Sequence, residues 1–178
     1  MKVSREQVAE HKTRILEAAG RLFRQRGFDD VTVAEIMKAA GLTHGGFYGH
    51  FPSKEALIAE AFAPAPPSPA PRKSTAAYAD SYLSAAHRDD LSDACAFSAL
   101  GTEAARGSAE LRQSMTESTR RQIERFMADA PGKTAPDKRR AAIAAWSAMV
   151  GAMVLARIVD KDLSDEILQE TRKALPVA

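Results

Sequence analysis

The spacing of two short helices in the first third of the chain constrains its fold more than any other feature. Thr32 and Glu35 stand in the T-x-x-E pattern of a capping box, so a helix is expected to begin after Thr32 and to end at Gly41. Thr43 can cap a third helix that runs through His50. Only three residues, the first of them Gly41, separate the two helices. Short helices joined by such a glycine-containing turn are typical of a helix-turn-helix.

The rest of the chain is also predicted to be helical. Ser4 and Gln7 form an earlier capping box ahead of a helix over 5–26, and a fourth helix is expected over 54–63. The proline-rich segment 64–71 cannot continue a helix because proline lacks an amide hydrogen. It is either an extended connector or a loop without a role. Helical patterns then return over these ranges: 74–87, 94–105, 108–129, 137–159 and 163–174.

These patterns predict an all-α protein of two parts. We expect an N-terminal three-helix helix-turn-helix domain at 1–52 and a helical domain at 53–178. Hydrophobic residues make up 45% of the chain, enough to form a core, and alanine is used heavily, which favours helices.

Charge, cysteine content and hydropathy indicate where in the cell the protein acts. The formal net charge is only +2, although residues 1–54 carry nine Lys/Arg against six Asp/Glu. Cys95 is the only cysteine, and the N-terminus has no signal-peptide pattern, so we expect a cytoplasmic location. The apolar stretch 141–156 is shorter than the roughly 18 residues of a membrane span. We interpret it as a buried helix and expect no membrane partner.

The sequence contains no pattern typical of an enzyme. It has no phosphate-cradling glycine loop, no zinc-ligand spacing and no nucleophile motif, and its four histidines are scattered. We therefore expect no catalytic activity, no cofactor and no metal. A helical interaction module that does not bind DNA remains an alternative.

Residues 32–54, TVAEIMKAAGLTHGGFYGHFPSK, closely resemble the DNA-binding segment of the TetR/AcrR regulators. The matching positions are Thr32, Ile36, Ala40, Gly41, Leu42, Thr43, Phe47, Tyr48, His50, Phe51 and Lys54. The resemblance is specific over about residues 8–62 and only architectural beyond. It implies a homodimer that binds double-stranded operator DNA through its N-terminal domain and a small-molecule effector through its C-terminal helices.

Eight residues are predicted to contact DNA. They are Thr32, Thr43, His44, Gly45, Gly46, Tyr48, His50 and Lys54. His44 lies in the first turn of the recognition helix, where such helices touch base edges, and Lys54 adds charge at a helix N-terminus suited to phosphate. The glycines let the backbone approach the DNA groove closely. The alternatives are that His44 is simply solvated and that Tyr48 belongs to the core.

The C-terminal helices are predicted to carry a dimer interface and a ligand pocket. A seam of mostly small residues suits close helix approach, and we assign the interface to Ala142, Ala145, Ala152, Ala156, Ile167 and Leu168. Large apolar side chains could line a pocket for a lipophilic or aromatic inducer: Tyr82, Phe97, Met115, Phe126, Trp146, Met149 and Met153. Both sets could instead fill the core of a monomer.

Cys95 gives an alternative mode of regulation. It lies near the predicted start of a helix, a position that favours a reactive thiolate. Its surroundings resemble a TetR subgroup in which some members respond to reactive electrophiles. An inert cysteine is the competing interpretation. The sequence thus predicts a ligand-released repressor of a palindromic operator, or else a redox or electrophile sensor acting through Cys95.

Overall fold

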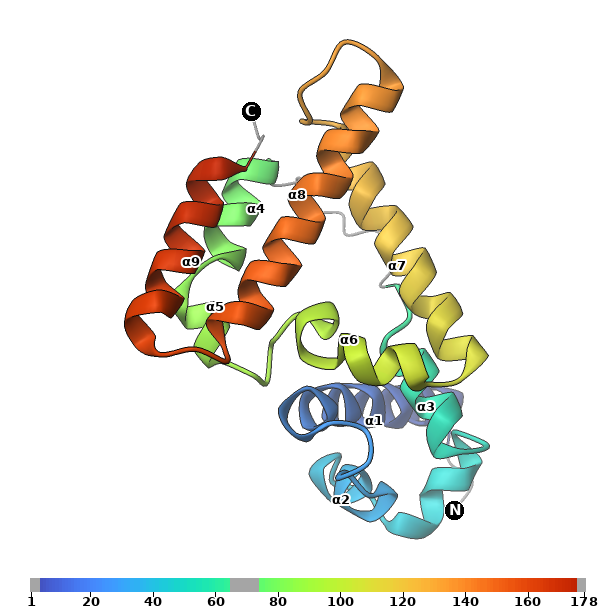
Figure 1. The fold of residues 1–178 in the computed structure, drawn as a ribbon. Coiled ribbons are helices and arrows are strands. Elements are labelled where there is room, and N and C mark those ends of the chain that lie inside the picture. Colours follow the sequence, from blue (N-terminus) through green and yellow to red (C-terminus); the bar gives the residue numbers. More distant parts are fainter. Residues whose placement is uncertain (1–3, 65–73, 176–178) are drawn as a thin grey trace.

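The computed structural model describes residues 4–64 and 74–175, and these residues form helices and turns (Figure 1). Most of the predicted connector 64–71 lies outside the described residues. The helices are α1 (Arg5–Arg26), α2 (Val33–Ala39), the 3-10 helix η1 (His44–Gly49), α3 (Lys54–Ala61), α4 (Thr75–Tyr82), α5 (Ala85–Asp89), α6 (Ala96–Arg106), α7 (Ala109–Met127), α8 (Ala135–Ala156) and α9 (Lys161–Ala174). The predicted all-α class is confirmed.

Local capping explains most helix boundaries. The predicted capping boxes of Ser4 and Thr32 are both present, with each side chain accepting a hydrogen bond from the third residue of its helix. The predicted helix 74–87 is wrong in one respect, because it is divided into α4 and α5. The Ser84 hydroxyl accepts a hydrogen bond from the His87 amide at 3.2 Å and so starts a new helix.

Two hydrophobic cores divide the molecule. The first lies within α1, α2, η1 and α3, which we call the head, and also takes in Leu100, Ala104 and Leu111 from α6 and α7. The second lies among α4, α7, α8 and α9, which with α5 and α6 we call the body. In Figure 1, α6 lies between the two, directly over α1. Because Leu57 and Phe62 belong to the head core, a domain boundary at residue 52 would cut through that core.

Helix α8 is apolar on two opposite faces. Its inner face packs inside a single chain through Ala142, Ala145, Trp146, Met149, Ala152, Met153 and Ala156. The four alanines and Leu168, which we assigned to a dimer interface, are at most 5% exposed within one chain and so offer little surface to a second copy. Their assignment to an interface stays a prediction. The seam does allow close helix approach, but its partners are helices of the same chain.

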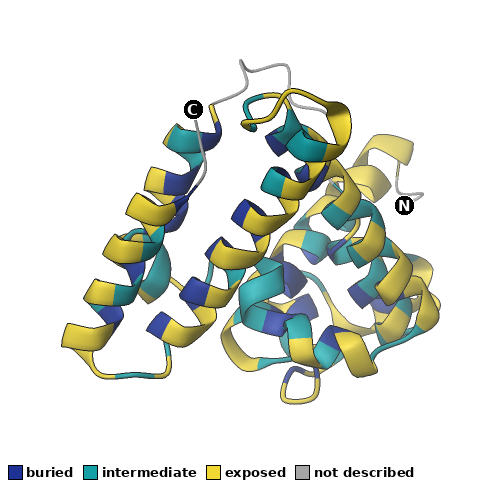
Figure 2. Ribbon diagram, turned by 45° about the horizontal axis from the view of Figure 1, so that its top comes forward, coloured by how far each residue is buried: buried dark blue, intermediate teal, exposed yellow. Residues whose placement is uncertain are grey.

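The outer face of α8 is exposed and also uncharged. It carries Ile143, Ala144, Ser147, Ala148, Gly151, Val154, Leu155 and Ile158. Figure 2 shows buried and exposed residues on opposite sides of the long C-terminal helices. This face explains why α8 is long and apolar enough to cross a membrane by length and composition, with only 39% of it buried. Such a face on a packed helix marks an interaction surface.

Candidate nucleic-acid interface

The predicted recognition helix is a short 3-10 helix. Our expectation that Thr43 caps it was wrong, because the Thr43 side chain makes no cap hydrogen bond. Instead the Thr43 carbonyl accepts from the Gly46 amide at 3.1 Å, the tighter pattern of a 3-10 turn. Three of the six residues of η1 are glycine, and each costs about 1 kcal/mol of α-helix propensity relative to alanine. The segment therefore depends on packing to hold its place.

Two phenylalanines supply that packing. Phe47 is completely buried and Phe51 is 2% exposed, and their rings stack with centroids 5.9 Å apart in the head core. Tyr48 meets the edge of Phe47 at 5.2 Å but is 70% exposed, so the interpretation of Tyr48 as a core residue is wrong. His44, Gly45 and Gly46 are exposed with Tyr48. Burial of Phe47 and Phe51 thus fixes one face of η1 in the core and leaves the other face exposed to solvent.

The chain itself gives no reason for glycine at positions 45 and 49. Neither residue has a positive φ, and a Cβ built at either position meets nothing within 4 Å. Gly41 is different: its φ is +67°, which glycine adopts without strain. A requirement for small residues at 45 and 49 must therefore come from a surface outside the chain.

Polar contacts from α1 fix both ends of α2, the helix that precedes the turn. Arg14 donates a hydrogen bond to the Ala40 carbonyl, at the end of α2. Arg26 Nη1 lies 2.8 Å from Glu35 Oε1 at the beginning of α2. The Arg26 guanidinium, with hydrogen bonds from Thr32, lowers the pKa of Glu35 to about 2. The Thr32 hydroxyl is thus engaged in capping α2, and its contact with DNA stays a prediction.

His50 does not share the exposed face of Tyr48. It is half-buried, and its ring lies edge-on to His11 with centroids 6.0 Å apart. Burial, followed by the nearby His11 and Lys12, lowers the pKa of His50. Its predicted contact with the sugar-phosphate backbone requires the side chain to turn outward. Lys54 is half-buried at the first position of α3, directly after the capping residue of that helix.

The residues predicted to line a ligand pocket divide between the two cores. Six of them lie in or against the body core, but Met115 packs against the head core instead. Trp146 lies at the centre of an aromatic cluster, with centroids 5.7 Å from Tyr82, 5.6 Å from Phe97 and 6.0 Å from Phe126. Burial raises the pKa of the adjacent Tyr78 to about 12. These side chains fill the space among themselves, so a ligand must displace some of them.

Cys95 borders this aromatic cluster. It is the capping residue of α6 and is half-buried, and its amide donates to His87 Nε2 at 3.3 Å. His87 Nδ1 lies 2.7 Å from the Tyr82 carbonyl, which fixes the neutral ring with its proton on Nδ1. The buried Tyr82 hydroxyl lies beside the Cys95 thiol and the Ser98 side chain, both close enough to interact with it. The thiol thus lies at a helix N-terminus, next to a buried hydroxyl.

The sequence indicated that α8 is apolar on two sides, and the structure shows which side is exposed. The positions 144, 148, 151 and 155 repeat at the same 3-4 spacing as the buried seam. Leu163 and Ile167 of α9 border the same face across a groove of about 540 Å³. Gly151 was the available signal, because glycine inside a long helix indicates close packing of a neighbour.

The fold and the exposed face of η1 together define a helix-turn-helix protein with a helical second part. Residues 15–61 match the family described as "Bacterial regulatory proteins, tetR family". This match covers most of the head and about a quarter of the chain.

Individual relatives agree in the head alone. This chain is 51% identical, over 51 residues or 29% of its length, to the uncharacterized HTH-type transcriptional regulator YdgC of Bacillus subtilis. The matched part is 26% of YdgC, so the chain spans about a quarter of the length of that relative.

Solved structures agree over nearly the whole chain, at low sequence identity. A TetR-family transcriptional regulator from Agrobacterium tumefaciens matches with a TM-score of 0.72 and 17% identity, covering 96% of this chain and 100% of its own. The reduced form of NemR from E. coli matches with a TM-score of 0.66 and 21% identity, covering 94% and 97%. These similarities concern the fold.

Proposed function

We propose that the protein is a transcriptional regulator that binds operator DNA through the exposed face of η1. The main support for this proposal is the orientation of η1. Phe47 and Phe51 are buried, whereas His44, Gly45 and Tyr48 are exposed. Glycines that the chain itself does not require leave room for a DNA backbone. Lys54 adds positive charge at the N-terminus of α3, a favoured position for phosphate. The match of residues 15–61 to the tetR family of bacterial regulatory proteins supports this function over an enzyme.

Two copies are proposed to join through the outer faces of α8 and α9. The exposed uncharged face of α8, the bordering Leu163 at 43% exposure and the groove between them support this arrangement. A two-fold dimer presents two reading segments to successive major grooves and so favours a palindromic site. Burial in a dimer also explains the apolar outer face of α8 without a membrane, as expected for a cytoplasmic regulator.

A lipophilic or aromatic effector is proposed to release the DNA by entering the aromatic cluster around Trp146. The cluster supplies large apolar surfaces between helices, where small-molecule sites commonly lie. A ligand releases DNA only if it binds the DNA-incompetent conformation better than the competent one. Repression rather than activation is part of this proposal.

Selection of genomic DNA fragments by the purified protein tests the function. We expect a palindromic sequence to be enriched, and its affinity to fall steeply as salt rises because phosphate contacts release counterions. Recovery of unrelated fragments with no common sequence at several salt concentrations would contradict sequence-specific binding.

Lys54 and His44 are expected to act differently on that operator. Lys54→Ala should weaken all related sequences similarly and reduce the slope of log affinity against log salt by about one unit, because a phosphate contact carries no sequence information. His44→Ala should instead change which bases are preferred. Titrations of the operator and its single-base variants distinguish the two, and a uniform loss in both mutants would exclude a base contact by His44.

A second candidate function is sensing of electrophiles by Cys95. The half-buried thiol, its position at the N-terminus of α6 and the Tyr82 hydroxyl beside it favour this function. The Cys95 sulfur would bond to the β-carbon of an α,β-unsaturated carbonyl compound. The thiol proton would end on the α-carbon, so no other reactant is needed.

Treatment with N-ethylmaleimide tests this candidate. The wild-type protein is expected to gain one adduct by mass and to lose operator binding, since the adduct displaces neighbours at the start of α6. Cys95→Ser should bind the operator normally and be unaffected. An adduct on the wild type that leaves DNA affinity unchanged would rule out regulation through Cys95.

A further inference from the structure

Helix α6 of the body contacts the head at its C-terminal end through Glu103. The Glu103 Oε2 atom accepts a hydrogen bond from the backbone amide of Phe28 at 2.6 Å. Phe28 directly follows Gly27, the residue that ends α1. A carboxylate that accepts from a backbone amide makes a strong hydrogen bond, because the acceptor is charged. This contact is half-buried and joins residues 75 positions apart.

The backbone of the head is shaped to receive this carboxylate. Gly27 has a φ of +83°, and a Cβ at that position would lie 2.9 Å from Glu103 Oε1. Any other residue at position 27 would strain the backbone and crowd Glu103. Both the conformation and the lack of a side chain at Gly27 are thus explained by the position of Glu103.

The N-terminal end of α6 faces the head through a second residue of α1. Arg24 is half-buried, with its guanidinium 5.3 Å from the centroid of Phe62. Burial lowers its pKa, and the negative charge of Asp93, just before α6, acts against that lowering. Arg24 and Gly27 are less than one turn apart on α1. The head therefore meets both ends of α6 through one end of α1.

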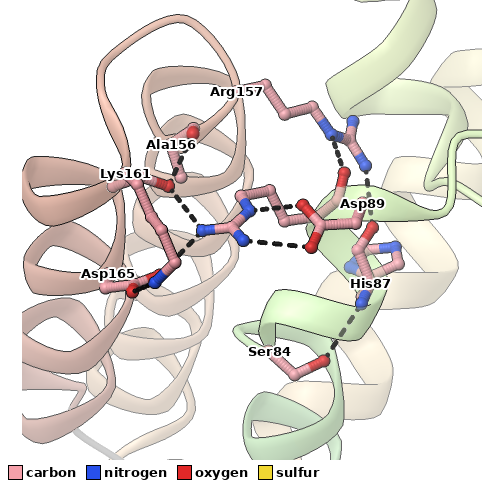
Figure 3. Close-up of polar contacts among 9 residues, drawn as sticks. Ser84, His87, Asp89, Ala156, Arg157, Lys161 and Asp165 are labelled. Carbon is pink, nitrogen blue, oxygen red and sulfur yellow. Dashed lines mark hydrogen bonds and ion pairs between the residues drawn. The ribbon is translucent and has the colours of Figure 1, made fainter.

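The body holds α6 in place through Arg157, at the end of α8. Its guanidinium donates to the Ser98 hydroxyl on α6 at 3.1 Å. It also donates to the His87 carbonyl at 3.1 Å (Figure 3). The neighbouring Arg88 binds Asp165 at the start of α9 with a distance of 2.7 Å. The contacts of Arg157 join the first turn of α6 to α5 and to the end of α8.

We propose that Glu103 is the positioning residue that fixes the orientation of the DNA-reading head relative to α6. The inference rests on the proposed function. No described helix continues from head to body, because α3 ends at Ala61 and α4 begins at Thr75. Orientation must therefore depend on packing and on contacts such as the Glu103–Phe28 hydrogen bond.

Operator variants of altered spacing test the role of Glu103. The wild-type protein would first select an operator from genomic DNA, and the affinity would then be measured with one or two base pairs inserted between the half-sites. Glu103→Ala is expected to bind the original operator about tenfold more weakly, within the usual range of coupling between sites, and to discriminate less against inserted spacings. Binding to an isolated half-site should not change. Glu103→Gln, which keeps an acceptor oxygen, should restore much of the discrimination.

Two further measurements separate positioning from stability. Hydrogen exchange of the Phe28 amide should accelerate in Glu103→Ala, while sedimentation and thermal melting should show an intact folded dimer. Glu124→Ala, an exposed carboxylate on α7, is the matched control and should behave as wild type. If Glu103→Ala discriminates spacings as the wild type does, the inference is overturned. If the wild type selects no operator at all, the proposed function fails and this inference fails with it.

Discussion

Replacing Gly151 with arginine is expected to convert the protein into a folded monomer that no longer binds its operator tightly. Gly151 lies on the outer face of α8, and a Cβ there meets nothing within 4 Å, so one chain accommodates the new side chain. In a dimer the same guanidinium would be buried against an apolar partner, which costs several kcal/mol without a paired charge. Loss of the second reading segment should reduce operator affinity by about 10²–10⁴-fold, the usual gain from linking two binding sites.

Sedimentation and operator titration of the same preparation check this expectation. Gln113→Arg places an identical side chain at an exposed position of α7, away from the outer face of α8, and should remain dimeric. Circular dichroism should show undiminished helix content in both variants, because arginine has a higher helix propensity than glycine. If the Gly151→Arg protein stays dimeric, the dimer interface does not include the outer face of α8.

The sequence predicted most helix boundaries to within about two residues because caps are local. A serine, threonine or aspartate hydrogen-bonds an amide three residues later, and this pattern needs no knowledge of the fold. Eight helices of the described chain begin in this way. Ser84 was missed as a boundary because it stands inside a stretch that is otherwise helical.

Tertiary contacts could not be predicted in the same way. Both faces of α8 repeat small residues at helical spacing, so periodicity shows two packed faces but not which one stays inside the chain. Met115 has the residue type and spacing of a pocket residue, yet it packs against the head core because the first half of α7 crosses over α3. Glu103 had no sequence signal, since its partner is a backbone amide far away in the chain.

The head shows how far residue types can indicate a site. Tyr48 and Phe47 are neighbouring aromatic residues, and sequence alone left Tyr48 open as a core residue. The structure separates them, because η1 turns one ring inward and the other outward. His50, placed on the DNA face by its match to the family motif, turns toward His11. Residue type predicted the segment correctly, and the backbone decided the direction of each side chain.

Phe47→Ala and Tyr48→Ala are therefore expected to abolish operator binding for opposite reasons. Phe47 is completely buried beside Phe51, and truncation of such a phenylalanine costs about 3–5 kcal/mol. The head should melt well before the body, since η1 has three glycines and little intrinsic helix stability. Tyr48→Ala removes a ring that is 70% exposed, so the melting temperature should change little while the affinity for the operator falls.

Melting followed separately in the two parts of the molecule distinguishes these outcomes. Trp146 lies in the body core, so its fluorescence reports the body, whereas far-ultraviolet circular dichroism reports all helices. Phe47→Ala should show an early loss of ellipticity without a change in Trp146 fluorescence, and its dimer should persist because α8 and α9 are untouched. Tyr48→Phe is the matched control: recovery of binding would assign the role to the ring, and continued loss would assign it to the hydroxyl. If Tyr48→Ala binds the operator as the wild type does, the exposed face of η1 is not the surface that reads DNA.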